Sequence, residues 1–277
     1  MQKPLICIQD ITTLFTLLDD RLQRKEIKEG RPSILTDSEV LTMLLWCTIL
    51  LRQKHLKDIY RFISYYHATE FPKLPSYKNF VLHAHRLIPK MLELLEAGLA
   101  VSSIQFVDST MLPVCKLDRA NFHKVAKGVA DFGKNWQGWH YGFKLHASVN
   151  DKGQLCSFHF TPASFYDAQA LPHLQSIQKR EVKVMVGDGT YNATVMREKI
   201  WKTFGTFVLA PPHPKQKKKL TSRWQHFLLR ARSKVEAVFD YLKNHLNLVT
   251  SFPRSISGYF LNYLRHLLAY QIMRGVS

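Results

Sequence analysis

The sequence has few cysteines, and none of the four belongs to a C-x-x-C pair. Cys7, Cys47, Cys115 and Cys156 are too far apart for a zinc knuckle, and no cluster of histidine and cysteine supplies the usual zinc ligands. Isolated thiols of this kind are typical of a reducing compartment, where disulfides are rare. We therefore expect neither a disulfide framework nor a zinc site.

A long hydrophobic run is also missing. The most apolar stretch, Val40 to Leu51, has 12 residues, whereas a transmembrane helix needs about 20. The first ten residues lack the basic start and the apolar run of a secretory signal. These absences predict a soluble, cytoplasmic protein that has no membrane contact.

Acidic residues are scarce relative to basic ones. The 277 residues include 21 Asp and Glu against 39 Lys and Arg, which gives a formal net charge of +18. The excess is uneven, because residues 1–100 carry 14 basic and 11 acidic side chains, whereas residues 101–277 carry 25 and 10. Between Glu198 and Glu236 there are ten basic residues and no acid. This distribution favours a polyanionic partner such as nucleic acid.

Helical patterns dominate the first hundred residues. The sequence from Thr36 to Glu39 matches a capping box, and apolar residues follow at helical spacing as far as Leu51. Further helices are predicted over residues 56–66 and 78–97, with a break or kink at Pro89. We interpret residues 1–100 as a helical amino-terminal domain for DNA binding or for oligomerisation, two roles that the sequence does not separate.

After residue 100 the pattern changes to strands and helices. Short strands are predicted over 104–107, 182–186 and 206–210, and a hairpin over 141–149 and 154–161. Helices are predicted over 167–177 and 195–203, and a long helix with a broad apolar stripe from about Trp224 to Leu246. A meander followed by strands that alternate with helices predicts an α/β class, with a mixed sheet covered by helices.

Three of the few acids stand out by their setting. Asp108 follows the strand 104–107, Asp188 follows the strand 182–186, and Glu236 lies on the long helix. At about 100° per residue, Arg232 and Lys243 fall on the same edge of that helix as Glu236. An ordinary surface ion pair would explain the helix alone. It would not explain two aspartates at strand ends, where open α/β sheets place their ligands.

Carboxylates are costly to bury without a partner, and Mg²⁺ prefers oxygen ligands. Two such ions can activate a water or a 3′-hydroxyl and stabilise the leaving oxygen of a phosphodiester. Ser109 lies beside Asp108, but no G-x-S-x-G sequence surrounds it, which argues against a serine hydrolase. We therefore predict that Asp108, Asp188 and Glu236 bind metal and carry the catalysis.

A lysine run precedes the long helix, and we expect it to contact DNA phosphates. It consists of Lys215, Lys217, Lys218 and Lys219. Lysines on a loop act as point charges and read no bases. A solvated loop or a localisation signal is the alternative interpretation.

An aromatic segment lies beside Lys134 and Lys144. It contains Trp136, Trp139 and Tyr141. Stacking on bases is one interpretation of such a segment, but packing in the core is the one we favour from the sequence.

The order of these motifs resembles that of the DDE-type transposases of bacterial insertion sequences. The likeness covers about residues 100–275 and rests on Asp108-Ser109-Thr110, the segment 141–146 (Tyr-Gly-Phe-Lys-Leu-His), Gly187-Asp188 with Tyr191, and Arg232-x3-Glu236-x6-Lys243. The last family motif begins with a tyrosine three residues before the arginine, where this sequence has Leu229.

The resemblance implies a ribonuclease-H-like catalytic domain over residues 101–277, preceded by the small helical domain. It implies that the three acids form a triad that uses Mg²⁺ or Mn²⁺, with two ions expected. It also implies that Arg232, Lys243 and Tyr191 contact DNA.

The sequence thus predicts an enzyme that cleaves double-stranded DNA at element ends and joins the freed 3′-hydroxyl to target DNA. We expect it to act as a homodimer or higher homo-oligomer on DNA, at the nucleoid in the bacterial cytoplasm. Two alternatives stay open: a two-metal nuclease that only hydrolyses, and a transposase-derived protein that binds DNA without catalysis. The intact triad argues against the second.

Overall fold

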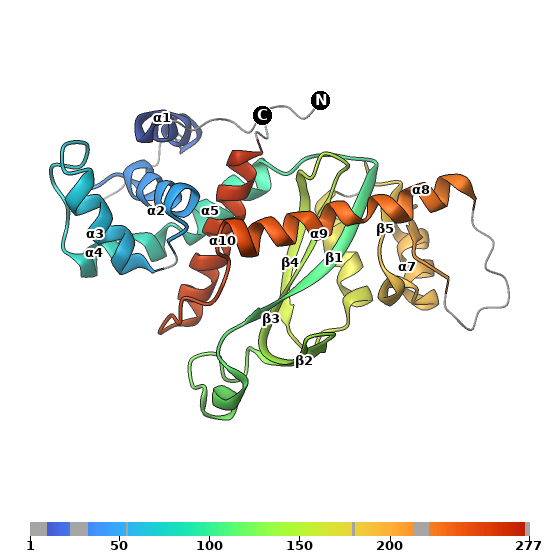
Figure 1. Ribbon diagram of the computed structural model, residues 1–277. Helices are drawn as coiled ribbons and strands as arrows, with labels where there is room; N and C mark the ends of the chain where they lie inside the picture. Colours follow the sequence, from blue (N-terminus) through green and yellow to red (C-terminus); the bar gives the residue numbers. More distant parts are fainter. Residues whose placement is uncertain (1–9, 23–32, 54, 179–180, 213–221, 275–277) are drawn as a thin grey trace. The chain divides into compact units, whose positions relative to one another are not determined.

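The computed structural model describes residues 10–22, 33–53, 55–178, 181–212 and 222–274 (Figure 1). The chain forms two compact units. A helical unit comprises residues 1–98 together with 242–275, and a sheet unit comprises residues 99–241. The prediction placed a boundary after residue 100 and assigned everything beyond it to one domain. In the structure, residues 242–274 fall in the same unit as the amino-terminal helices.

The helical unit is built around two helices that are buried on most sides, α2 and α10. Helix α10 packs against α2, α4 and α5, and α1 packs against α2. The helices of this unit are α1 (Ile11–Leu22), α2 (Asp37–Leu51), α3 (Leu56–Tyr66), α4 (Tyr77–Arg86), α5 (Ile88–Ala97) and α10 (Ile256–Met273). Of the described helices, none is long and apolar enough to cross a membrane.

The predicted helix boundaries in this unit follow from local chemistry. The Thr36 hydroxyl accepts the backbone N–H of Glu39, and the Glu39 carboxylate accepts the N–H of Thr36 at 2.6 Å, which confirms the capping box of α2. Helix α3 has the predicted bounds. The helix predicted over 78–97 is divided at Leu87, because Pro89 lies in the first turn of α5 and cannot donate to the preceding turn.

The sheet unit contains one mixed sheet. The strand order is β2-β3-β1-β5-β6, and β4 pairs with β3. The pairs β1–β3, β2–β3 and β3–β4 are antiparallel, whereas β1–β5 and β5–β6 are parallel. The strands are β1 (Ile104–Pro113), β2 (Asp131–Asn135), β3 (Gly138–Val149), β4 (Leu155–Pro162), β5 (Val184–Val186) and β6 (Phe207–Leu209).

Helices cover the sheet. Helix α6 packs on β4, α7 on β6, and α9 on β1 and β3 (Figure 1). The α-helices of the unit are α6 (Leu171–Gln178), α7 (Thr194–Phe204), α8 (Arg223–Ala231) and α9 (Ser233–Asp240). Short 3₁₀ helices follow β1, β4 and β5, and these are η1 (Leu117–Phe122), η2 (Asp167–Ala170) and η4 (Gly189–Tyr191). The mixed sheet with its covering helices confirms the predicted α/β class.

Three predictions about elements in this unit were wrong in detail. Strand β1 continues through Asp108 to Pro113, because its backbone keeps pairing with β3. Strand β2 was not predicted. The predicted long helix is divided at Arg232, which ends α8 and precedes α9, and it continues as the π-helical turn η5 (Tyr241–His245). Regular spacing of 100° per residue therefore does not extend to Lys243.

Candidate active site

The parallel pairing of β1 with β5 places two aspartates side by side. The register joins Ile104 to Val184 and Phe106 to Val186, and Asp108 and Asp188 each come two residues later. Side chains alternate along a strand, so residues two apart point to the same face. The backbone of Asp188 is still extended, with φ −79° and ψ −172°. Both carboxylates therefore leave the sheet in the same direction.

Local hydrogen bonds fix the two side chains. The Asp108 Oδ1 accepts the backbone N–H of Ser109 at 2.8 Å. The Asp188 Oδ1 accepts the backbone N–H of Thr190 at 2.9 Å and also its hydroxyl, so Asp188 caps the turn η4. These contacts to neighbouring residues hold each carboxylate in one orientation.

Tyr191 closes the same turn from the inside. It is fully buried in the core cluster with Val107 and Met185. A Cβ on Gly187 would lie 2.5 Å from the Tyr191 ring, so only glycine lets the ring pack against the backbone there. The side chain of Tyr191 has no exposed surface, so its contact with DNA stays a prediction that this burial does not support. The Gly-Asp-x-x-Tyr sequence instead encodes the turn that holds Asp188.

The third acid, Glu236, lies on α9 and is linked to Asp108 by an arginine. Arg232 lies at the start of α9, and its Nη2 is 2.7 Å from the Oε1 of Glu236. Its Nη1 is 3.6 Å from the Oδ2 of Asp108. The Glu236 side chain is 51% exposed. The surface ion pair that the sequence analysis gave as the alternative interpretation thus exists, and it extends to the first aspartate.

The electrostatics of Asp108 reflect its burial and four neighbouring residues. Burial raises the pKa of its carboxyl to about 6, and the negative charges of Asp188 and Glu236 add to this rise. The backbone N–H of Ser109 and the guanidinium of Arg232 act in the opposite direction. An acid whose pKa remains raised despite an adjacent arginine lies where more positive charge would be stabilising.

The acidic set fits a divalent cation by its chemistry. Its donors are all carboxylate oxygens, the ligands that Mg²⁺ prefers. Among the residues that the structure describes, however, no group of three His, Cys, Asp or Glu is arranged to hold a metal ion. Two contacts account for this. The guanidinium of Arg232 reaches both Asp108 and Glu236, and one oxygen of Asp188 is engaged by Thr190.

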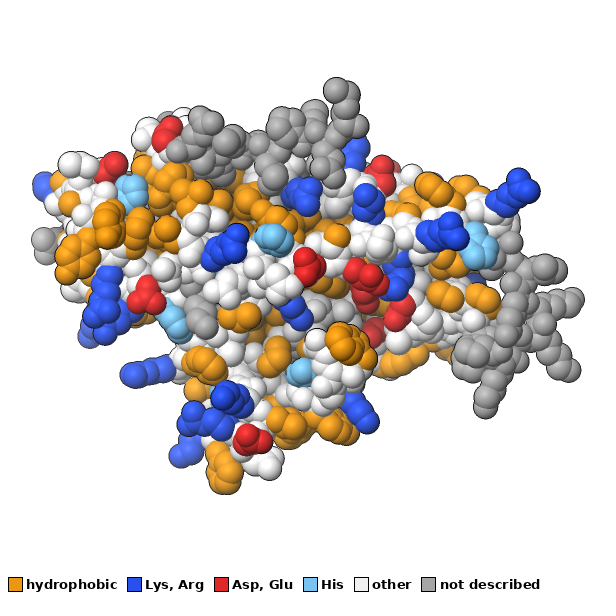
Figure 2. All heavy atoms as spheres, in the orientation of Figure 1, with side chains coloured by type: hydrophobic (Ala, Val, Ile, Leu, Met, Phe, Trp, Pro, Cys, Tyr) orange, Lys and Arg blue, Asp and Glu red, His pale blue; other side chains and the backbone are white. Residues whose placement is uncertain are grey.

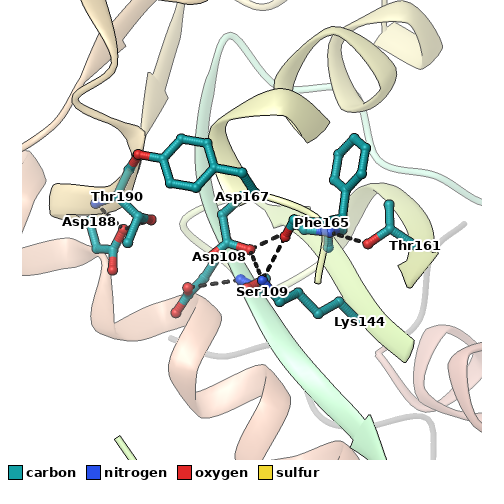
Figure 3. A network of polar contacts seen from close by, with 10 residues as sticks. Asp108, Ser109, Lys144, Thr161, Phe165, Asp167, Asp188 and Thr190 are labelled. Carbon is teal, nitrogen blue, oxygen red and sulfur yellow. Dashed lines mark hydrogen bonds and ion pairs between the residues drawn. The ribbon is translucent and has the colours of Figure 1, made fainter. Parts of the chain in front are cut away.

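A second polar group lies beside Asp108 (Figure 3). The Lys144 ammonium donates to the Asp167 Oδ1 and to the backbone carbonyl of Phe165, both at 2.8 Å. The buried His146 ring contacts the Thr161 hydroxyl through Nε2 at 2.8 Å, and its Nδ1 lies 3.9 Å from Asp167. Burial lowers the pKa of His146 to about 4, so the ring is neutral at pH 7.

Sequence reasoning missed Asp167, which it took for the start of a helix. The available signal was Lys144 and His146, two polar residues on one face of a buried strand, because a buried lysine requires an acidic partner. The Tyr166 hydroxyl donates to the backbone carbonyl of Thr190 at 2.8 Å. This bond joins the segment that carries Asp167 to the turn that carries Asp188.

The hydroxyl of a second tyrosine, Tyr191, is buried near three carboxylates. Burial raises the pKa of Tyr191 well above its ordinary value, and Asp167, Asp108 and Asp188 raise it further. Among the described residues, the hydroxyl has no hydrogen-bond partner. It therefore keeps its proton and remains a donor within the field of three carboxylates.

The remaining predicted site residues are not brought to this cluster by any described contact. Lys243 lies in η5, in the helical unit, and burial lowers its pKa. Lys215, Lys217, Lys218 and Lys219 lie outside the described residues.

The fold and the site define a ribonuclease-H-like α/β domain with a cluster of acids, and a comparison with known families agrees. Residues 99–256, or 158 of the 277, match the model of the family "Transposase DDE domain". Because the match covers more than half of the chain, the chain belongs to this family. None of the curated proteins compared with the chain matches it. Membership implies a transposase-type, nucleotidyl-transfer function, DNA binding and the general use of divalent metals in the family.

Proposed function

We propose that the protein is a transposase that cleaves DNA at the ends of an insertion sequence and joins the freed 3′-hydroxyl to target DNA. The observation that supports this most is the convergence of Asp108, Asp188 and Glu236 from β1, the end of β5 and α9. The charges of Asp188 and Glu236 both raise the pKa of Asp108, and Arg232 links Asp108 to Glu236. Family membership supports the same reaction class.

In this proposal the three acids hold two Mg²⁺ or Mn²⁺ ions. Such ions activate the attacking oxygen and stabilise the leaving oxygen of the phosphodiester. The residues themselves orient the site: Ser109 and Thr190 fix the two aspartates, and Arg232 keeps Glu236 turned towards Asp108.

Double-stranded DNA is the proposed substrate, and a homodimer or higher homo-oligomer is the proposed assembly on it. The +15 balance of residues 101–277, 25 basic against 10 acidic, supports DNA as the partner. We propose Arg232, Lys243 and the lysine run as phosphate contacts. The position of the run ahead of the long helix and the net charge of +18 support its part in this.

Isosteric substitution of the aspartates tests the proposal. Asp188→Asn keeps an oxygen that accepts from Thr190 but removes the charge, so the turn is retained and the metal site is not. We expect metal-dependent cleavage of DNA carrying the element ends to fall by at least about a thousandfold, with DNA binding retained. The readout is cleavage and strand-transfer products on gels, with and without Mg²⁺.

Asp131→Asn is the matched control. Asp131 also lies on a strand, and its Oδ1 accepts the N–H of the next residue at 2.7 Å, as in Asp108. Its substitution should leave cleavage unchanged. Substantial cleavage by the Asp188→Asn protein would overturn the proposed site. Cleavage without any joined product would instead identify a nuclease that only hydrolyses.

A DNA-binding protein without catalysis is the second candidate function, and one observation favours it. The guanidinium of Arg232 satisfies Asp108 and Glu236 in the way that a metal would. If the wild-type protein binds element ends but shows no cleavage at any Mg²⁺ or Mn²⁺ concentration, this candidate replaces the transposase.

A further inference from the structure

The hairpin of β2 and β3 ends in an ordered two-residue turn. Strands β2 and β3 pair from Asp131 to Asn135, and Trp136 and Gln137 form the turn. The Asn135 Oδ1 accepts the N–H of Gln137 at 2.9 Å and contacts the His140 Nε2 at 3.0 Å. Gly138 has φ +117°, a conformation that side chains rarely allow. The direction of the turn residues is therefore fixed by the backbone.

This turn holds a tryptophan almost entirely in solvent. Trp136 is 90% exposed and Trp139 is 55% exposed, whereas Tyr141 is 7% exposed. Core packing, the interpretation favoured from the sequence, is thus right for Tyr141 and wrong for the two tryptophans. A ring that buries so little surface contributes little to folding, because apolar stabilisation is proportional to the area removed from water.

Strand β2 and the segment that precedes it carry exposed basic side chains. Lys134 faces Trp139 across the strands, and its Nζ lies 5.8 Å from the centre of the Trp139 ring. Residues 116–134 contribute five exposed basic side chains and two acids, and the basic ones are Lys116, Arg119, Lys124, Lys127 and Lys134. Phe122, 83% exposed, adds a third aromatic ring. Residues 116–130 form a lobe of the sheet unit, drawn in green in Figure 1, and basic and hydrophobic side chains gather on it in Figure 2.

The lobe packs against the hairpin through Tyr141 of β3. The Tyr141 ring lies 4.9 Å from that of Phe132 and 6.1 Å from that of His123. Its hydroxyl donates to the backbone carbonyl of Ala126 at 3.4 Å. The buried tyrosine thus supports the segment that carries the lysines.

The charge of this surface identifies the kind of partner. The cores of protein interfaces are depleted in lysine, so Lys134 beside Trp139 and the exposed basic side chains of residues 116–127 disfavour a protein partner. Grooves that bind single-stranded nucleic acid combine basic side chains for the phosphates with aromatic rings for the bases. In a paired duplex, side chains reach only the base edges in the grooves. An exposed ring can therefore stack on the face of a base only if that base has left the duplex stack.

We propose that Trp136 and Trp139 stack on unpaired bases of the DNA while Lys134 and its neighbours contact the adjacent phosphates. This proposal rests on the proposed function, since it assumes that DNA is the substrate. It adds that the protein prefers DNA with locally unpaired bases.

The test compares two DNA duplexes of equal length, one fully paired and one with three unpaired thymines at its centre. We expect the wild-type protein to bind the second duplex more tightly, by roughly 5- to 150-fold for each stacked base. Trp136→Ala and Trp139→Ala should each lose most of this preference, and Trp136→Phe should keep most of it. The slope of log affinity against log salt should not change in the tryptophan variants, because no phosphate contact is removed.

Trp201→Ala is the matched control. Trp201 is also an exposed tryptophan, at 58%, but it lies on α7 and not on the hairpin. It should retain the preference. Equal affinity of the wild-type protein for both duplexes would overturn the stacking proposal and leave the proposed function intact. Absence of binding to either duplex would overturn the proposed function as well. A change in oligomeric state in Trp136→Ala, with unaltered DNA binding, would show that the surface binds protein.

Discussion

At the scale of single residues, Asp108 is a carboxylate whose burial has an electrostatic cost. Its pKa is raised from 3.8 to about 6, and its side chain is 20% exposed. The folded protein therefore binds this proton more tightly than the unfolded chain does. The contribution of Asp108 to stability is greatest below about pH 4 and is lost as pH rises through about 6, by at most about 3 kcal/mol.

Asp108→Asn should remove this pH dependence. Near pH 4 the variant and the wild-type protein should unfold with similar free energies, and at pH 8 in the presence of a chelator the variant should be more stable, by at most about 3 kcal/mol. Urea unfolding at the two pH values measures the difference. Excess Mg²⁺ at pH 8 should raise the melting temperature of the wild-type protein and leave that of the variant unchanged. A constant difference between pH 4 and pH 8 would contradict the electrostatic interpretation.

At the scale of elements, the turn after β5 is specified by the glycine that precedes Asp188. An alanine at position 187 would place its Cβ 2.5 Å from the Tyr191 ring, so either the ring or the turn must move. We expect Gly187→Ala to destabilise the protein by about 1–3 kcal/mol, as overpacking does, and to reduce cleavage because Asp188 moves with the turn. Urea unfolding and the cleavage assay measure the two effects.

Gly189 provides the control for this prediction. It lies two residues further on in the same turn, and a Cβ added there would have no atom within 4 Å. Gly189→Ala should therefore change stability by much less than Gly187→Ala. Equal losses in the two variants would show that chain flexibility, and not contact with Tyr191, explains the glycine at 187.

Prediction from sequence succeeded where one local pattern decides an element and failed where distant pairing decides it. The end of α2 near Leu51 and its start at Thr36 are local, and both were found. The strand predicted to end at residue 107 continues because Asp108 pairs with Ala147 of β3, which a polar Asp-Ser-Thr sequence does not reveal. Local rules often fail at functional positions, and Asp108, a proposed metal ligand, lies where the predicted strand was expected to end.

The candidate site divides in the same way. Asp108, Asp188 and Glu236 could be proposed because each sits in a recognisable local setting and in a known motif order. Asp167 could not, since its significance depends on Lys144, 23 residues away in the sequence. The exposure of Trp136 was also hidden, because the strand β2 that makes it a turn residue alternates too weakly to be recognised as a strand.

At the scale of the whole molecule, the net charge of +18 predicts salt-dependent DNA binding. Each phosphate that a side chain neutralises contributes about 0.9 to the slope of log affinity against log salt. Replacing Lys215, Lys217, Lys218 and Lys219 by alanine should flatten that slope by about 3–4 and weaken all DNA sequences alike. Titrations at several salt concentrations, with element-end and random DNA, measure both effects.

The ratio of affinities for element-end and random DNA serves as the internal control and should stay constant, because lysines on a loop read no bases. An unchanged slope would place the DNA elsewhere on the protein. A changed ratio would mean that the run contributes to sequence recognition.

The division of the chain into units also determines which unit can fold first during synthesis. The sheet unit is one continuous stretch, residues 99–241, whereas the helical unit is assembled from residues on both sides of it. Helix α10 is buried along most of its length and packs against α2, α4 and α5. Domains fold as units while the chain emerges from the ribosome at about 5–20 residues per second. The amino-terminal helices are synthesised first, but their apolar surface stays exposed until α10 has been synthesised. The sheet unit can therefore complete its core before the helical unit does.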